Sequence, residues 1–255
     1  MATLNRISRT SILAGGALLA LVAVTGCSES AGDENTPEKR SFGPVGDQLT
    51  IARSNGDLTV KPADVDEVEV TRWFSGWSAV GDKPKASWKL DGDKLSLTTD
   101  CGSVISNCSA RYEILVPRKT ALTVEGDNGR TTASGFTTDL DITSDNGAVT
   151  VDGASGALTV RSGSGDVRAT GLKSTRVDAG SDNGKVHLAF AGVPDQVGVK
   201  TNNGGVTVEV PDGTYKVTTK TDNGKVDVDL PSDAGSAHAI TATTDNGGIT
   251  LRTAG

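Results

Sequence analysis

The sequence predicts an all-β protein, built as a parallel β-solenoid with coils of about 18–20 residues. A short phrase ending on glycine recurs at nearly constant spacing, and aliphatic residues alternate with polar ones on both sides of it. The chain also has 32 glycines and only 4% aromatic residues, a composition typical of many short strands and turns. Together these features indicate coils made of a strand, a sharp turn and a second strand.

The repeated phrase marks one turn in each coil. From Gly129 onward, its final glycines are 18, 18, 19, 20, 20 and 23 residues apart. We expect glycine there because the chain must adopt a positive φ, while a preceding Asn or Asp can bond nearby backbone amides. The predicted turn residues are Asn55, Gly56, Asn128, Gly129, Asn146, Gly147, Gly165, Asn183, Gly184, Asn203, Gly204, Asn223, Gly224, Asn246 and Gly247.

The segments beside each turn have the two-residue period of a half-buried strand. Leu140 and Ile142 precede the turn at Gly147, and Val149 and Val151 follow it. Such alternation directs one side of the strand into a core and leaves the polar side in solvent.

Two observations leave room for other arrangements. The copy at Gly129 carries Thr131 and Ala133 where aliphatic residues are expected, so this turn is predicted to pack loosely or to lie at an edge. Asn-Gly between alternating strands is also the strongest short-range signal for a hairpin, so an antiparallel β meander or sandwich is the alternative fold. The near-constant period favours the solenoid.

The repeat is interrupted between the first turn and the second. Strand-like runs remain at residues 68–74, 86–90, 94–98 and 112–116. Five of the nine aromatic residues also lie here: Trp73, Phe74, Trp77, Trp88 and Tyr112. We interpret 57–120 as an irregular cap over the solenoid core, and 121–255 as the regular repeats. An aromatic platform on which tryptophan stacks against sugars is the alternative.

Residues 1–26 have the layout of a secretory leader, with Arg6 and Arg9 before an apolar run. That run is too short to serve as a permanent membrane helix. Val24, Thr25, Gly26 and Cys27 resemble a lipobox, which implies acylation of Cys27 and cleavage before it. An ordinary leader with an incidental cysteine is the alternative.

Residues 27–44 are polar and are predicted to form a flexible tether between the lipidated cysteine and a solenoid domain at 45–255. We therefore expect the protein on the extracytoplasmic face of the bacterial cell membrane, held there by lipid. Cys101 and Cys108 remain as a pair in an oxidising compartment and are predicted to form a disulfide. Two metal-binding thiolates are the alternative, but no histidine or further cysteine lies nearby.

One family resemblance supports this fold. The run Tyr112-Glu113-Ile114-Leu115-Val116-Pro117, then Leu122-Thr123-Val124 and the glycine-punctuated strands, resembles the bacterial β-strand-repeat family described as putative adhesins. The resemblance covers roughly residues 46–255. It implies a right-handed parallel β-solenoid in an exported or membrane-anchored protein of unknown function, and it supplies no catalytic residue.

The sequence lacks a recognisable catalytic motif. His187 and His238 are its only histidines, and neither has the spacing of a hydrolase or zinc motif. We predict a protein that is not an enzyme and has no metal site or cofactor. A glycan-active enzyme that uses clustered carboxylates is the least favoured alternative.

An acidic residue precedes Asn-Gly in five copies. If the coils stack in register, these carboxylates form a column whose repulsion bound Ca²⁺ could offset. Gly163 and Asn202 interrupt the column, so solvated turn residues are the favoured interpretation. The five acids are Asp127, Asp145, Asp182, Asp222 and Asp245.

The mature chain is strongly acidic. Removal of the leader takes two arginines from a formal charge of −7, which leaves −9. Nucleic acid and anionic membrane surfaces are poor partners for that balance. Our leading hypothesis is a lipid-anchored solenoid that binds an envelope protein, a glycan or the cell wall. An envelope accessory or sensor protein that partners a membrane signalling system is the alternative.

Overall fold

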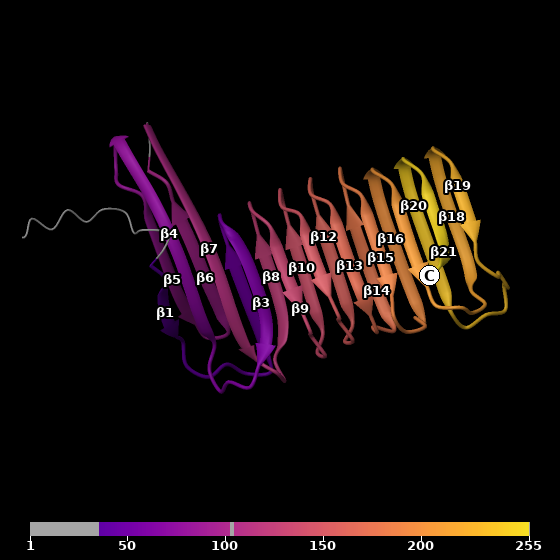
Figure 1. The fold of residues 1–255 in the computed structure, drawn as a ribbon, viewed down its shortest axis with the longest axis horizontal. Helices are drawn as coiled ribbons and strands as arrows, with labels where there is room; N and C mark the ends of the chain where they lie inside the picture. The colour runs from indigo at the N-terminus through magenta and orange to yellow at the C-terminus, as the bar shows by residue number, and fades with distance from the viewer. Residues whose placement is uncertain (1–35, 103–104, 255) are drawn as a thin grey trace, which may run out of the picture.

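The computed structural model describes residues 36–102 and 105–254, and within them the chain forms 21 β-strands and no helix (Figure 1). None of the described residues therefore belongs to a helix long and apolar enough to cross a membrane. The strands form two sheets of eleven and ten strands, which we call sheet A and sheet B.

Both sheets run along the whole molecule, and their strands lie in the following order from end to end. Sheet A contains β1 (Glu38–Ser41), β4 (Glu69–Val80), β7 (Ile105–Pro117), β3 (Asp57–Ala63), β9 (Thr131–Ser134), β11 (Val149–Asp152), β13 (Val167–Leu172), β15 (Val186–Phe190), β17 (Val206–Val210), β21 (Ile249–Thr253) and β19 (Val226–Asp229). Sheet B contains β18 (Lys216–Asn223), β20 (Ala239–Asn246), β16 (Gln196–Asn203), β14 (Arg176–Ser181), β12 (Leu158–Ser162), β10 (Leu140–Ser144), β8 (Ala121–Gly126), β2 (Gln48–Arg53), β6 (Lys94–Asp100) and β5 (Lys85–Asp91).

Each repeated turn carries the chain from sheet B to sheet A, and equivalent residues of successive coils lie side by side. Leu140 of β10, for example, pairs with Leu122 of β8 on one side and Leu158 of β12 on the other, both in parallel register. The predicted parallel β-solenoid is confirmed, and the antiparallel alternative is wrong for the repeats. Among the described strands, antiparallel pairing occurs only between β1 and β4, β4 and β7, and β5 and β6.

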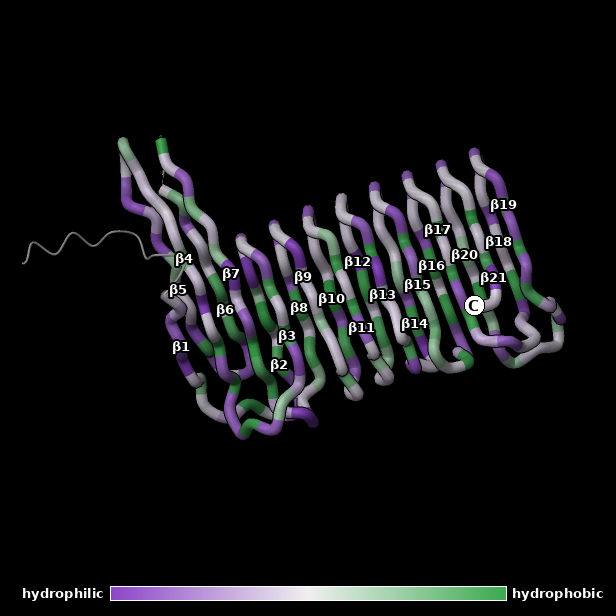
Figure 2. The backbone as a smooth tube through the Cα atoms, viewed as in Figure 1, coloured by the Kyte–Doolittle hydropathy of each residue, from purple (hydrophilic) through white to green (hydrophobic). Residues whose placement is uncertain are grey.

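A narrow apolar core runs along the whole solenoid between the two sheets. Figure 2 shows apolar positions recurring from coil to coil. Ile142 and Val160 of sheet B, and Val151 and Leu188 of sheet A, are all almost completely buried. Each buried aliphatic side chain of this size contributes roughly 1.5–3 kcal/mol, so the stack of many small residues substitutes for a thick core.

At both ends, the stacking order of the coils differs from their order in the sequence. The last coil of the chain, β20–β21, lies between β16–β17 and β18–β19. Likewise β2–β3 lies between β6–β7 and β8–β9. The outermost coil at the far end is therefore β18–β19, where Val226 and Val228 are exposed.

The predicted reason for glycine at the turns is wrong at most positions. Among the eight turn glycines, only Gly56 and Gly129 have a positive φ, about 105° each. Instead, a Cβ at each later turn would overlap the carbonyl oxygen of the glycine in the adjacent coil. The overlapping pairs are Gly147 with Gly129, Gly165 with Gly147, Gly184 with Gly165, Gly204 with Gly184, Gly247 with Gly204 and Gly224 with Gly247.

A column of hydroxyl groups accompanies these glycines, three residues before each of them. The hydroxyl of Ser144 accepts a hydrogen bond from the amide of Gly147, and Ser162 does the same for Gly165. The hydroxyls also donate to glycine carbonyls of the adjacent coil, from Ser162 to Gly147, Ser181 to Gly165, Thr201 to Gly184, Thr244 to Gly204 and Thr221 to Gly247. Buried polar groups of the turn are satisfied within the stack.

The cap is built mainly from β1, β4 and β5, which extend the sheets beyond the coil β6–β7. Phe42 and Trp88 meet edge to face with ring centroids 5.8 Å apart, and Arg72 stacks over the Trp88 ring at 4.1 Å. Phe42 is buried and Glu38–Ser41 forms a strand, so this part of the predicted tether is folded. The folded domain begins earlier than residue 45 because Phe42 has an aromatic partner that only the fold supplies.

The expectation of a loose turn or an edge at Gly129 is also wrong. Thr131 and Ala133 are fully buried, and β9 lies inside sheet A between β3 and β11. Smaller side chains suffice here because Arg53, from the neighbouring coil, fills the space and hydrogen-bonds to Thr131.

We predict that Gly204→Ala destabilises the solenoid, because the new methyl group would collide with the carbonyl of Gly184. Overpacking of this kind costs about 2–3 kcal/mol. Gly198→Ala, in the same coil, is the matched control, since its Cβ would meet nothing closer than the Asp178 carboxylate at 3.5 Å. Urea denaturation should show a lower midpoint for Gly204→Ala only; equal midpoints would contradict the close-packing explanation.

Candidate binding groove beside the disulfide

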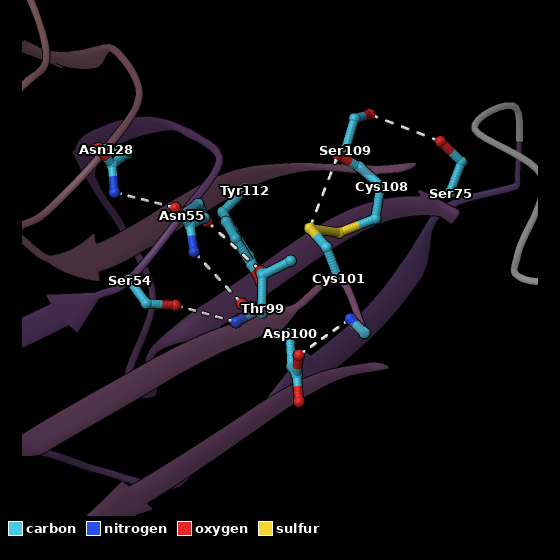
Figure 3. Close-up of a disulfide and its surroundings, with 11 residues drawn as sticks. Ser54, Asn55, Ser75, Thr99, Asp100, Cys101, Cys108, Ser109, Tyr112 and Asn128 are labelled. Atoms are coloured by element: carbon cyan, nitrogen blue, oxygen red, sulfur yellow. Dashed lines mark hydrogen bonds between the residues drawn. A yellow bond between two sulfur atoms is a disulfide. The ribbon is translucent and has the colours of Figure 1, made fainter. Parts of the chain in front are cut away.

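A recess at the capped end lies where the row of Asn-Gly turns, which we call the turn edge, meets the β4–β7 ribbon (Figure 3). This groove has a volume of about 590 Å³. It is lined by Asn55, Gly56, Asp57, Trp73, Thr99, Cys101, Cys108, Ser109, Ala110 and Arg111. The groove is therefore lined by groups of several kinds, namely backbone, amide, hydroxyl, carboxylate, guanidinium and indole groups.

Asn55 enters the groove as the last member of a ladder of asparagine side chains along the turn edge. In this ladder each Nδ2 donates to the Oδ1 of the neighbouring coil. The donor and acceptor pairs are Asn128 to Asn55, Asn146 to Asn128, Asn203 to Asn183, Asn246 to Asn203 and Asn223 to Asn246, at 3.0–3.2 Å. The ladder is interrupted at Ser164, where Asn183 donates to the carbonyl of Gly163 instead. It fixes the orientation of Asn55.

Arg53 holds the same turn from inside the core. Its guanidinium donates to the carbonyls of Gly56, Gly129 and Arg130 and to the hydroxyl of Thr131, although only 2% of the residue is exposed. Burial lowers the pKa of Arg53, and the carboxylates of Asp57 and Asp127 oppose that shift. Arg53 stands where later coils have Ser or Thr.

Gly126 provides the room for this arginine. It occupies the same repeat position in the next coil, and a Cβ on it would lie 2.5 Å from a guanidinium nitrogen of Arg53. Arg53 and Gly126 therefore pack as a pair. This pair was not predicted from the sequence, because only the turn residues and the aliphatic positions were considered.

Thr99 connects the first turn to Tyr112 of β7. Its amide donates to the hydroxyl of Ser54, its carbonyl accepts from Asn55, and its hydroxyl lies 2.9 Å from that of Tyr112. Burial raises the pKa of Tyr112, and the hydrogen bond with Thr99 opposes that shift. Asn55 and Thr99, which both line the groove, thus belong to one connected polar network.

The predicted disulfide between Cys101 and Cys108 is confirmed, with Cα atoms 5.3 Å apart. It joins the chain just after β6 to the ribbon strand β7 and forms part of the groove wall (Figure 3). In the regular coils a turn ending on glycine, usually Asn-Gly, makes this passage between sheets. Here the covalent bond restrains the longer passage.

Trp73 and Arg111 form the opposite wall, from directly paired positions of β4 and β7. The Arg111 guanidinium lies 4.1 Å from the centre of the Trp73 ring, a cation–π contact. One face of the indole is therefore already covered. A sugar can use the rest of this wall through the ring edge and the guanidinium donors.

The remaining predicted chemical groups do not converge on the groove. His187 lies on the outer face of β15, where burial lowers its pKa, while the His238 ring is hydrogen-bonded to the carbonyl of Pro194 (3.0 Å). No cluster of three or more His, Cys, Asp or Glu side chains suited to a metal occurs within residues 36–102 and 105–254. Cys27 and the leader lie outside the described residues.

The carboxylates of the turn edge are spread along the solenoid. Asp127 and Asp145 are in adjacent coils, and Gly163 separates them from Asp182. Asn202 takes the next place and donates to Asp182 at 3.2 Å. The column of carboxylates is thus interrupted at Gly163 and Asn202, as the sequence predicted.

The family model of Toastrack DUF4097 matches residues 37–253. The chain belongs to this family. The match spans the cap as well as the regular coils, so the groove is built from Toastrack residues throughout. No curated protein with a similar sequence was found.

Solved structures similar to this Toastrack chain include a putative cell adhesion protein from Clostridium sporogenes, with 14% identity, 86% of this chain and 99% of that chain covered, and a TM-score of 0.39. A putative adhesin from Bacteroides fragilis has 14% identity, coverage of 86% and 98%, and a TM-score of 0.40. A putative adhesin from Parabacteroides merdae has 10% identity, coverage of 89% and 98%, and a TM-score of 0.33.

We predict strong coupling between Arg53 and Gly126. Arg53→Ser leaves a cavity and unpaired carbonyls, and Gly126→Ser collides with the arginine, so each should lose about 2–3 kcal/mol of unfolding free energy. The double variant Arg53→Ser/Gly126→Ser restores the hydroxyl found in later coils, and its loss should be smaller than the sum by about 1–3 kcal/mol. Denaturation of all four proteins measures this coupling, and simple additivity would contradict it.

Proposed function

We propose that this protein is a non-catalytic lipoprotein of the bacterial cell envelope that uses the groove to bind a polar glycan chain. The observation that carries the proposal is the groove itself, where an aromatic and cationic wall faces fixed amide and hydroxyl groups. Glycans present many hydroxyls and a few apolar ring faces, and this mixture matches such a lining.

Preorganisation supports binding at this place. Asn55 is held by Asn128 and Thr99, and the Cys101–Cys108 bond restrains the neighbouring strand. A ligand therefore does not have to order these groups, and ordering is one of the main free-energy costs of association. The groove also adjoins the turn edge, where further polar side chains recur from coil to coil.

The anchor part of the proposal rests on the sequence. The leader ends in Val24, Thr25 and Gly26 directly before Cys27, and strand β1 begins only eleven residues after that cysteine. More than one acyl chain at Cys27 would hold the domain stably at the membrane surface.

Cys27→Ala should release the protein from the producing cells, because no lipid can then be attached. We expect it in the medium or the soluble envelope fraction, while the wild-type protein stays with the membranes. Ser28→Ala is the matched control and should fractionate as the wild type does. Retention of Cys27→Ala in the membrane fraction would contradict the anchor.

Removal of the wall should weaken glycan binding. We expect Trp73→Ala/Arg111→Ala to bind isolated cell-wall polysaccharide at least about tenfold more weakly, a loss of about 1.4 kcal/mol. Arg176→Ala, on the exposed outer face of sheet B, is the control and should leave binding unchanged. Co-sedimentation measures the affinities, with circular dichroism to verify folding. Unchanged binding, or crosslinking in cells to one membrane signalling protein, would contradict this proposal and favour a sensor.

A further inference from the structure

The β4–β7 ribbon extends beyond the turn edge (Figure 1). Its end carries exposed apolar side chains. Trp77 is 57% exposed, Val80 52% and Ile105 50%. These are the three most exposed of the large apolar residues in the described part of the chain. We call this group of three the ribbon tip.

Trp77 and Ile105 lie on one face of the ribbon. Trp77 pairs with Asn107, so Ile105, two residues along β7, is its diagonal neighbour on the same side. Val80 pairs with Ile105 after a register shift between Ser78 and Val80. The three residues of the ribbon tip are thus neighbours at the end of one two-stranded ribbon.

The strands around the ribbon tip also lack charge. Residues 74–81 and 101–110 contain no Asp, Glu, Lys or Arg, although 22% of the whole chain is charged. Bringing this segment into a less polar environment therefore requires no ionised side chain from either stretch to lose water.

The end of the ribbon is stiffened by covalent and steric constraints. Gly76 pairs with Cys108, and a Cβ at Gly76 would lie 2.8 Å from the side chains of Cys108 and Pro84. Together with the Cys101–Cys108 bond, this close packing fixes the direction in which the ribbon projects.

The chain enters the domain from the same side. Strand β1 runs antiparallel to β4, with Glu38 opposite Arg72 and Ser41 opposite Glu69, so the N-terminal end of β1 faces the same way as the ribbon tip. Val80 is eight residues beyond Arg72, about 26 Å along the strand. The eleven residues from Cys27 to Glu38 can reach about 36–40 Å when extended, enough to place Cys27 level with the tip.

We propose that the ribbon tip rests in the interfacial layer of the membrane that holds the lipid anchor. The inference rests on the anchor proposed above. Tryptophan favours the boundary between headgroups and acyl chains, and the aliphatic Val80 and Ile105 add apolar area beside it. The lipid and the tip form two attachment points, which together set the orientation of the solenoid.

The test uses the mature lipidated protein in phosphatidylcholine vesicles with brominated acyl chains, which quench only tryptophan near the hydrocarbon. The chain has three tryptophans, so bromolipid should quench up to one third of the emission. Trp77→Phe should abolish that quenched part. Trp88→Phe, a change in the cap, is the matched control and should keep it.

The possible results separate the tip from the anchor. Loss of quenching in Trp77→Phe alone supports the proposal. Two results would overturn the membrane contact of the ribbon tip and leave the anchor intact. One is equal quenching in wild type and Trp77→Phe, and the other is no quenching in a protein that sediments with the vesicles. A protein partner would then be the remaining explanation for this surface. Failure of the lipidated protein to sediment with vesicles overturns both.

Discussion

The close approach of successive turns is the constraint on which the rest of the structure depends. At each turn, the carbonyl oxygen of one coil occupies the space where a side chain of the next coil would begin, so only glycine fits at Gly147, Gly184 or Gly204. This approach brings the asparagine amides of neighbouring coils within hydrogen-bonding distance. It also places the hydroxyl column under the turns, where buried carbonyls find donors.

The two ends of the solenoid differ from the regular coils in ways that end the parallel stacking. At the capped end, β4 pairs antiparallel with β7, and β5 pairs antiparallel with β6, which stops the parallel stacking. Phe42 and Trp88 cover the core there. At the other end β18–β19 lies outermost, although β20–β21 follows it in the chain. Thr219 replaces the aliphatic residue at an inward position there, as a terminal repeat exposed to solvent requires.

Sequence reasoning predicted the parallel coils and the Cys101–Cys108 bond, because both depend on local signals, namely period and cysteine pairing. It assigned the wrong cause to most turn glycines, since contact between coils is invisible in a single turn. It missed Arg53 for a related reason. A buried arginine becomes understandable only when Gly126, 73 residues away in the chain, is seen beside it. The swapped order of the end coils was not predicted, because the order in which coils stack depends on contacts between coils that lie apart in the sequence.

The groove and the ribbon tip are consequences of one departure from the repeat. Where Cys101–Cys108 replaces an Asn-Gly turn, β4 and β7 continue past the turn edge, by about 23 Å from Trp73 to Val80. With the tip at the lipid interface, the ribbon acts as a spacer, and its length from Trp73 to Val80 sets the distance of the groove and the turn edge from the membrane surface. A glycan bound there would lie between the solenoid and the bilayer, which favours a ligand of the protein's own envelope over one on a distant cell.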